Sequence, residues 1–472
     1  MTEYLLERFK VTPSLLRELV AEGLREGAGW CDLYFEKTEY FDLLLRDGAV
    51  SSGGSHLDYG CGVRALSGEK TGYAYAESTD RESLKRAARA AASIAAGTAS
   101  HVAAVPDTTS VRTADMYPQS IDWRRSDILG FSRFLGSVEA EIRRREPRTV
   151  KVVAMISFSV SEILMFNSLG ELSGDIRPLG SVTANVVFKS GEKVESRYVS
   201  RSFRCGSEML SDGIRDALVG DAVRGLDAAF EARRPKGGKM PVVIAAGAGG
   251  ILLHEAMGHA FEADFLRKGQ SVFEGRLGEK VARSGINIVD DGTLGKNRGS
   301  CALDDEGVAG QKTYMVMDGV LNSFLHDRIS AGWFGVAPTG NGRRESFRYN
   351  PIPRMRTTYM ESGPDGSAED LVASVKKGIY VDQFANGQVK IGEGDFTFYV
   401  KSGYTIENGR LAMPVKDINI IGNGPEALAD IRAVAGDLKI DDGTWTCGKE
   451  QSVPVGCGIP TVLVGSLTVG GE

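Results

Sequence analysis

The chain has 472 residues, of which 42% are hydrophobic and 25% are charged, and its formal net charge is −6 at pH 7. This length favours two domains, or three at most, and the acidic balance gives no electrostatic reason to expect a nucleic-acid partner. The longest apolar run, from Val242 to Leu253, is shorter than the roughly 20 residues that a membrane-spanning helix needs. The first residues lack the apolar core of a secretory signal. We therefore expect a cytoplasmic protein with reduced thiols and no membrane contact.

The N-terminal half predicts a two-layer α/β domain, in which amphipathic helices lie against extended segments. Residues 67–70 predict a hairpin turn, and the spacing of Thr79 and Glu82 is typical of a capping box that begins a helix. In chain order we expect a helix over 15–24, extended runs over 31–45 and 57–76, an alanine-rich helix ending near 97, a helix over 126–145, strands over 150–160 and 181–189, and a helix over 207–233.

A basic stretch with proline and glycine, Arg234–Lys239, is the best candidate for a domain boundary. We expect an N-terminal domain over 1–235, which a connection near 100–120 could divide into two sub-parts, and a C-terminal domain over 236–472. Many of the 59 glycines of the chain lie in this C-terminal half, which indicates frequent turns between short strands. The predicted fold class is α+β, with a β-rich C-terminal domain that is interrupted by one metal-binding helix.

That helix is preceded by an apolar strand and a glycine turn. Met240–Ala245 predicts a buried strand, the glycines of 247–250 predict a tight connection, and the helix is expected from 251 to about 265. The turn does not fit a phosphate-binding loop, because the third glycine of G-x-G-x-x-G and a following G-K-[ST] are both missing from it. We therefore reject nucleotide binding at this turn.

The predicted helix contains the pattern H-E-x-x-x-H, formed by His254, Glu255 and His259. In the shorter zinc-peptidase pattern H-E-x-x-H, both imidazoles lie on one helix face. The longer spacing would separate them on a regular helix, and a π-bulge near Gly258 would bring them together. Imidazoles suit Zn²⁺, which lowers the pKa of a bound water to about 7 and polarises a carbonyl. Glu255 would then act as the general base.

A catalytic zinc site needs a third protein ligand. Spacing alone leaves Glu262, Asp264, Cys447 and Cys457 as candidates. One alternative is a buried helix whose histidines only form hydrogen bonds with their neighbours. Another is a structural zinc in a non-catalytic peptide-binding or assembly subunit, which a closed site of four ligands would support.

Sequence blocks dispersed along nearly the whole chain resemble the TldD branch of the TldD/PmbA family of zinc metallopeptidases. In order, they are CDLYFEKTEY, GVRALSGEKTGYAYAE, GILLHEAMGHAFEADFLRKGQSVFEG, LDDEGVAGQKTYMVMDGVL, PTGNGRRES, GQVKIGEGDFTF, IENGRLAMPVK, CGKEQSVPVG and LTVGGE. The resemblance implies an ATP-independent peptidase that cuts peptides and unfolded segments in peptide maturation or degradation. It also implies that His254, His259 and Cys447 bind zinc and that Glu255 is the base. Cys457 stays the reserve ligand, because the block around Cys447 departs from the family pattern.

The resemblance further implies a dimer. The active subunit of the family pairs with a related chain that lacks the metal motif, and a homodimer is the alternative; this chain has the motif and so resembles the active subunit. Its late block differs from the family pattern C-G-K-x-G-Q, because Glu450 directly precedes Gln451 without a second glycine. We expect an extended peptide as substrate, bound by pairing with a sheet edge.

Two other polar segments have more than one interpretation. The acidic run Asp304–Gly307 does not have the spacing of a calcium loop, and we interpret it as a polar turn rather than a cation site. The run Asn341–Ser346 contains two arginines, which would either bind a carbonyl or carboxylate of the substrate or lie in an exposed turn with an ion pair.

Overall fold

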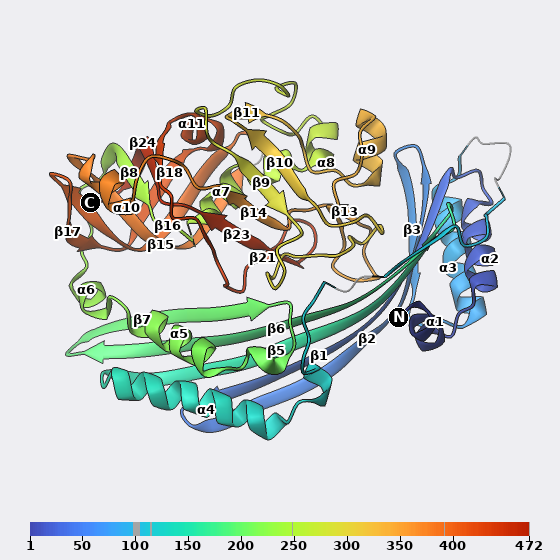
Figure 1. Cartoon of the computed structure of the whole chain (residues 1–472), viewed down its shortest axis with the longest axis horizontal. Helices are drawn as coiled ribbons and strands as arrows, with labels where there is room; N and C mark the ends of the chain where they lie inside the picture. The colour runs from blue at the N-terminus through green and yellow to red at the C-terminus, as the bar shows by residue number, and fades with distance from the viewer. Residues whose placement is uncertain (98–103, 114–115, 248, 391, 472) are drawn as a thin grey trace.

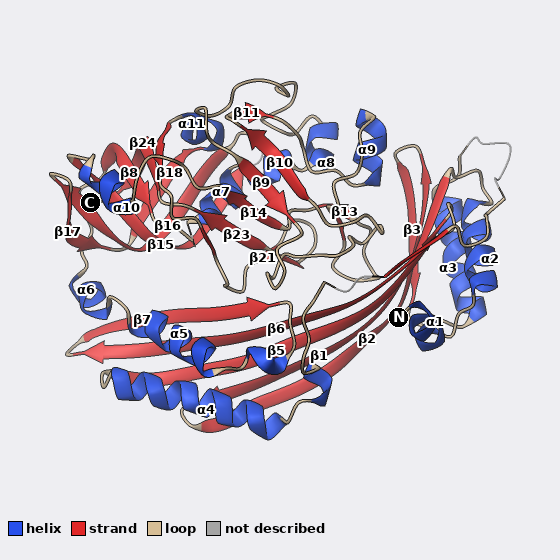
Figure 2. Ribbon diagram, in the orientation of Figure 1, coloured by secondary structure: helices blue, strands red, loops and turns tan. Residues whose placement is uncertain are grey.

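The computed structural model describes residues 1–97, 104–113, 116–247, 249–390 and 392–471. The N-terminal part is a long twisted sheet with helices packed on it, and the C-terminal part is a β-rich body beside that sheet (Figures 1 and 2). None of the helices in these ranges is long and apolar enough to cross a membrane.

The N-terminal sheet has seven strands, several of which are long. Their order is β3-β2-β1-β5-β6-β4, and β7 pairs with a separate part of β6. β1 and β5 are antiparallel along almost their full length, from Asp32 opposite Asn167 to Arg46 opposite Val153. The strands are β1 (Trp30–Arg46), β2 (Ala49–Ser67), β3 (Lys70–Ala76), β4 (Ser110–Thr113), β5 (Thr149–Asn167), β6 (Glu171–Ser190) and β7 (Lys193–Phe203).

Two groups of helices pack on this sheet and form two separate hydrophobic cores (Figure 1). The core under the first group includes Leu33 and Phe35 of β1, and the core under the second includes Leu43 and Leu45. Because side chains alternate along a strand, these four residues lie on one face of the sheet. The first group is α1 (Thr2–Phe9), α2 (Pro13–Leu24) and α3 (Arg81–Ile94), and the second is α4 (Ile128–Arg145), α5 (Asp212–Val223) and α6 (Leu226–Glu231).

The helices predicted over 15–24 and 126–145 and the hairpin turn at 67–70 are confirmed. The predicted cap of α3 was wrong by one residue. The carboxylate of Asp80 accepts the backbone N–H of Ser83 at 2.9 Å, whereas the hydroxyl of Thr79 is bonded to the hydroxyl of Tyr59 at 2.7 Å and so does not cap the helix.

The single helix predicted over 207–233 was also wrong. The chain instead forms a 3-10 turn, η2 (Ser207–Met209), and the separate helices α5 and α6. Gly225 lies between the two helices with a φ of 64°, a left-handed conformation that ends an α-helix.

The C-terminal part contains two main sheets. In the first, the order is β15-β8-β24-β18-β16-β17, and β15 also pairs with β16, so that five strands close into a ring, with β19 paired to β24. The second has the order β11-β10-β9-β14-β23-β20. The strands are β8 (Gly238–Ile244), β9 (Ile288–Asp291), β10 (Lys312–Met317), β11 (Val320–Leu321), β12 (Gly342–Arg343), β13 (Ile352–Pro353), β14 (Thr357–Met360), β15 (Lys377–Lys390), β16 (Asp395–Glu407), β17 (Arg410–Val415), β18 (Ile418–Asn423), β19 (Ile431–Val434), β20 (Lys439–Ile440), β21 (Thr446–Cys447), β22 (Val453–Pro454), β23 (Gly456–Ile459) and β24 (Val462–Gly470).

Helix α7 (Gly250–Ala256) lies between these two sheets, because it contacts β15 and β16 of the first and β14 and β23 of the second. One continuous hydrophobic core joins the helix to both sheets. The predicted fold class, α+β with a β-rich C-terminal part around the motif helix, is confirmed. α8 (Ala263–Arg267) overlaps the end of the helix predicted over 251–265. Three further short helices were not predicted, because their few residues give too little periodicity to detect: α9 (Arg328–Phe334), α10 (Ala368–Ala373) and α11 (Gly424–Ala429).

The acidic run predicted as a polar turn is buried and joins the two parts of the molecule. Glu306 forms an ion pair of 2.6 Å with Arg64 of β2, and Asp305 forms one of 2.5 Å with Arg177 of β6. Asp304 accepts backbone N–H groups, including that of Gly342 at 3.0 Å. The predicted polar turn is confirmed, since residues 305–306 form a turn and the backbone N–H of Gly307 donates to the carbonyl of Asp304. Its burial was not foreseen, because the arginine and amide partners of these carboxylates come together only in the folded chain.

Candidate metal centre

The start of α7 is fixed by close backbone packing. A Cβ atom on Gly250 would lie 2.5 Å from the backbone nitrogen of Gly458 in β23, so a glycine is needed there for the helix to approach the strand. Gly247 in the preceding turn has a φ of 94°, and Ala248 lies outside the described residues. These glycines therefore serve the strand-to-helix connection.

The predicted helix over 251–265 is interrupted after its second turn. α7 ends at Ala256, Met257 has φ −133° and ψ −39°, and the chain continues as a 3-10 turn, η3 (Gly258–Phe261), and then as α8. The expected π-bulge was therefore wrong. Gly258 accommodates the break, because a Cβ there would lie 2.2 Å from the sulfur of Met355. The 3-10 turn is tighter than an α-helix, and it places His254 and His259, which are five residues apart, on the same side of the chain.

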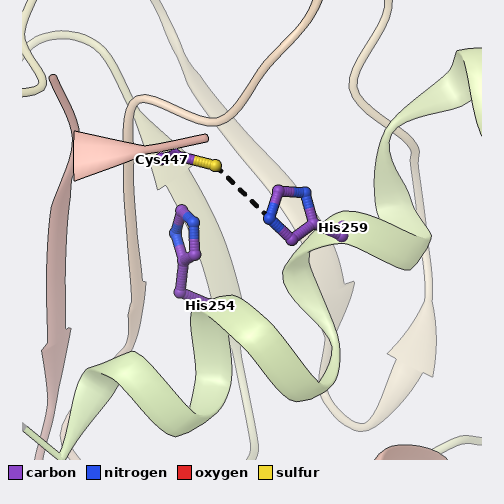
Figure 3. Close-up of side chains that lie close together, drawn as sticks. All are labelled: His254, His259 and Cys447. Atoms are coloured by element: carbon purple, nitrogen blue, oxygen red, sulfur yellow. Dashed lines mark hydrogen bonds between the residues drawn. The ribbon is translucent and has the colours of Figure 1, made fainter. Parts of the chain in front are cut away.

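His254, His259 and Cys447 point toward one another across this break (Figure 3). Their ligand atoms all lie within 4.8 Å of one another, and Sγ of Cys447 is 3.3 Å from Nε2 of His259. The three residues are 1%, 5% and 4% exposed. Two imidazoles and a thiolate are a donor set that suits Zn²⁺.

The two imidazoles differ in their hydrogen bonding. Within the part of the chain that the structure describes, neither ring nitrogen of the buried His254 has a hydrogen-bond partner. Leaving a buried polar group unpaired costs about 1–3 kcal/mol. A metal ion bound to His254 would satisfy one of these nitrogens, so the residues present fit a metal.

The charges of the site also favour a cation. Burial raises the pKa of the Cys447 thiol, but the two neighbouring imidazoles outweigh this effect and lower the pKa below its usual value. Burial lowers the pKa of His259, but the carboxylate of Glu262 and the Cys447 sulfur outweigh it and raise the pKa to about 10. The protein without metal therefore holds a thiolate beside an imidazolium, and a metal cation would replace the proton.

Glu262 lies behind His259 rather than among the three converging donors. Its carboxylate accepts a hydrogen bond from Nδ1 of His259 at 2.8 Å, and it also accepts the backbone N–H of Met355 at 3.1 Å. Nε2 of the same ring then faces Cys447. A carboxylate in this position fixes the tautomer and the orientation of a metal-binding histidine.

Lys449 connects the two acidic candidates. Its ammonium donates to Glu262 at 3.0 Å and to Asp264 at 2.7 Å. Asp264 is thus engaged by the lysine and is not among the converging donors. Sequence spacing gave no role to Lys449, although its place two residues after Cys447 is a signal that could have suggested one.

The loop that carries Cys447 is held by a second buried cation, Arg354. Its guanidinium donates to the carbonyl oxygens of Cys447, Lys449 and Gln451 at 2.7–2.9 Å. Glu450 in this loop has a φ of 52°, the left-handed conformation that a glycine adopts more easily. The loop therefore presents Cys447 in a fixed position without the second glycine of the family pattern.

Cys457 and Glu255 have different surroundings. Cys457 lies in β23, and burial raises the pKa of its thiol well above the usual value; it is not among the converging donors. Glu255 is partly exposed, and no other described side chain forms a hydrogen bond with its carboxylate. Glu255 follows His254 directly on α7. Its carboxylate therefore lies next to the three converging donors and is free to accept a proton.

The chain matches three parts of one peptidase family. Residues 31–95 match PmbA/TldA metallopeptidase domain 1, residues 132–234 match the central domain, and residues 237–471 match the C-terminal domain. The chain is 40% identical to the metalloprotease TldD homolog of Haemophilus influenzae, over 94% of this chain and 93% of that protein. It is 35% identical to the metalloprotease TldD homolog of Buchnera aphidicola subsp. Acyrthosiphon pisum, over 100% of this chain and 99% of that protein.

Solved structures share the fold. A protein of Thermotoga maritima, described as a proposed modulator of a DNA gyrase, has a TM-score of 0.77 at 22% identity, with 97% of this chain and 99% of that chain covered. TldE of Thermococcus kodakarensis has a TM-score of 0.75 at 18% identity, over 97% and 100%. Given the matches along its whole length and the identity to the TldD homologs, the chain belongs to the TldD branch of the PmbA/TldD family of metallopeptidases.

Proposed function

We propose that this chain is a zinc-dependent, ATP-independent peptidase that hydrolyses peptides or unfolded segments in peptide maturation or degradation. The observation that carries the proposal is the convergence of His254, His259 and Cys447, in which the buried His254 has no hydrogen-bond partner among the described residues. A zinc relative supports the choice of metal, since the chain is 35% identical over 50% of its length to a zinc metalloprotease TldD homolog of Saccharolobus solfataricus.

The three donors would hold the zinc ion, and each surrounding residue has a separate task. Bound zinc supplies Lewis acidity, which polarises a carbonyl and acidifies a water molecule. Glu255 accepts a proton from the attacking water and returns it to the leaving amine. Glu262 keeps the proton of His259 on Nδ1, which leaves the lone pair of Nε2 free to bind the metal.

A cavity next to the segment that leads to Cys447 supports an extended peptide as substrate. It has a volume of about 620 Å³ and lies between β7 and the segment that ends at Trp445, two residues before Cys447. β7 is at the edge of its sheet, and its residues 196 and 198–201 line the cavity. We propose that a peptide pairs with this edge, which binds the peptide backbone and tolerates many side chains. One end of the β7 edge is already paired within the chain, because the backbone N–H of Ser202 donates to the carbonyl oxygen of Asp442.

The rival function is a structural zinc in a non-catalytic subunit. Such a site has four protein ligands, whereas the described residues provide three converging donors, and the partly exposed Glu255 has no structural partner among them. This arrangement favours catalysis. We further propose that the chain works in the cytoplasm and pairs with a related chain that lacks the metal motif, with a homodimer as the alternative.

The deciding experiment measures zinc content and peptide hydrolysis of the purified chain, alone and with any related partner. Glu255→Gln is the matched variant, because it keeps the size of the side chain and removes its basicity. We expect stoichiometric zinc in both proteins and cleavage only in the unchanged one. Zinc in both with no cleavage in any pairing would favour the structural role, and the absence of zinc from both would overturn the metal assignment.

A further inference from the structure

A second cavity, of about 310 Å³, lies between the N-terminal sheet and the C-terminal part. On the sheet side it is lined by the β1 and β5 face that carries no helices, including Tyr34 and Ile163. Six arginines line it: Arg177, Arg204, Arg298, Arg343, Arg344 and Arg356. Two of them belong to the run Asn341–Ser346, which is buried except for Glu345, so the exposed-turn interpretation was wrong.

The carboxylates of this cavity do not neutralise its arginines. Glu36, Asp305 and Glu345 are its three acidic residues. Asp305 pairs with Arg177, Glu36 accepts the backbone N–H of Phe347 at 2.7 Å, and Glu345 accepts that of Ser452 at 2.7 Å. Two of the arginines also pair with carboxylates just outside the cavity, Arg177 with Asp175 at 2.7 Å and Arg344 with Asp32 at 3.6 Å. The other four gain no partner from the three acidic residues of the cavity, each of which already has one.

Four of the arginines have no ion pair with any described carboxylate: Arg204, Arg298, Arg343 and Arg356. Arg343 donates only to the carbonyl oxygens of Met355 at 2.5 Å and Pro454 at 2.7 Å. Arg356 is 2% exposed, and its Nη2 has no hydrogen-bond partner in the described ranges. Burial of unpaired charge is unfavourable, and it lowers the pKa of Arg204 and Arg343 below the usual value.

This arginine cavity borders the loop of the metal centre. Thr446, which precedes Cys447, lines the cavity, and its hydroxyl accepts a hydrogen bond from Nη2 of Arg298 at 3.2 Å. Arg343 bonds to the carbonyl of Met355, whose N–H is bonded to Glu262. A group bound among the arginines would therefore lie next to a peptide that reaches the metal.

We propose that the arginine cavity binds a carboxylate of the peptide substrate, either the α-carboxylate at its C-terminus or an acidic side chain near the cleaved bond. The inference rests on the proposed peptidase function and names the substrate class. Guanidinium groups bind carboxylates through paired, charge-assisted hydrogen bonds, and four of the arginines that line the cavity have no carboxylate partner among the described residues. The cavity thus selects for acidic peptides or for peptide ends.

Binding is measured on the zinc-loaded Glu255→Gln protein, with any partner it needs, so that the peptide is not consumed. Three fluorescent peptides of equal length are compared: one with a free C-terminus and neutral side chains, one with an amidated C-terminus, and one that is amidated but contains a glutamate. The proposal predicts that at least one carboxylate peptide binds about tenfold or more tightly than the neutral amide. Preference for the first identifies the α-carboxylate, and preference for the third identifies the side chain.

Arg356→Gln should remove this preference and leave the binding of the neutral amide unchanged. Arg204→Gln is the second variant, in case the first does not fold. Arg348→Gln is the matched control, because Arg348 lies close in sequence to Arg343 and Arg344 but outside the cavity. The charge that it removes is paired with Asp58 and Glu77. Equal binding of all three peptides, or an unchanged preference in both cavity variants, would overturn the proposal. Because the readout is binding, the result does not depend on whether the chain cleaves peptides.

Discussion

Replacement of Glu262 by glutamine should weaken zinc binding although Glu262 is not one of the three converging donors. The carboxylate is fully buried and accepts hydrogen bonds from His259, Lys449 and the backbone of Met355. Glutamine has the same shape and can still accept one or two of these bonds. It removes the negative charge that orients the imidazole and makes it a better donor.

The expected loss follows from this geometry. Removing a carboxylate that supports a metal-binding histidine lowers metal affinity about 10- to 100-fold, which corresponds to about 1.4–2.8 kcal/mol. The free energy of unfolding should fall by less than the loss of a buried charge usually implies. Lys449 keeps Asp264 at 2.7 Å and the carbonyl of Pro353 at 3.1 Å, so its ammonium is not left unpaired.

Zinc affinity would be measured by competition with a chromophoric chelator, and thermal unfolding of the metal-free proteins would show any general damage. Asp264→Asn is the control, because it disturbs the same lysine and leaves the hydrogen bond to His259 intact. We expect the affinity to fall in Glu262→Gln and to change by less than threefold in Asp264→Asn. Equal affinities in both variants and the unchanged protein would refute the role of Glu262.

Three further predictions concern the proton balance of the site, the packing of its helix and the junction between the two parts of the chain. In the metal-free protein, burial is outweighed at both groups: His254 and His259 lower the pKa of Cys447 to about 4, and Glu262 and Cys447 raise the pKa of His259 to about 10, from ordinary values of 9.0 and 6.5. Their contribution to the free energy of unfolding should therefore rise from pH 4 to 6.5, stay level to pH 9 and fall above pH 9. Denaturant titrations at a series of pH values would show this plateau. A plateau that persists in Cys447→Ser would contradict the assignment of the titrating groups to Cys447 and His259. Gly258→Ala should destabilise the protein by about 1–3 kcal/mol, because the new methyl group meets the Met355 sulfur, whereas Gly332→Ala, in an open position of α9, should be neutral or stabilising in the same thermal melts. Arg64→Met should cost about 3–5 kcal/mol in denaturant unfolding, because it removes the guanidinium that pairs with both of the buried carboxylates Asp32 and Glu306. Arg348→Met, whose ion pairs are more exposed, should cost less than about 1 kcal/mol, and similar losses in both would argue against the buried junction.

The local elements of the fold could be predicted where periodicity was long. The helices around Leu19 and Leu135 and the turn at 67–70 follow from spacing and turn chemistry. The short C-terminal helices and the closed ring of strands depend on contacts distant in the sequence, such as β15 with β8. Periodicity in a short window contains no information on such pairings.

The site shows the same limit in more detail. The pattern around His254 identified two of the converging residues, but a regular helix could not explain the spacing, and the break at Met257 depends on packing against Met355. Cys447 lies 188 residues after His259 and was one of four open candidates by spacing. Lys449 and Arg354 were missed, because their partners are carbonyls and carboxylates that only the folded chain brings near.

The long pairing of β1 with β5 determines how this protein can be divided for experiments. The family comparison separates domain 1, at 31–95, from the central domain, at 132–234, yet β1 belongs to one and β5 to the other, and they pair from Asp32 to Arg46. A fragment of either domain alone would expose a full-length strand edge, which invites aggregation. Expression trials should therefore treat the first 234 residues as a single folding unit, whose central strands are synthesised far apart in time and meet late.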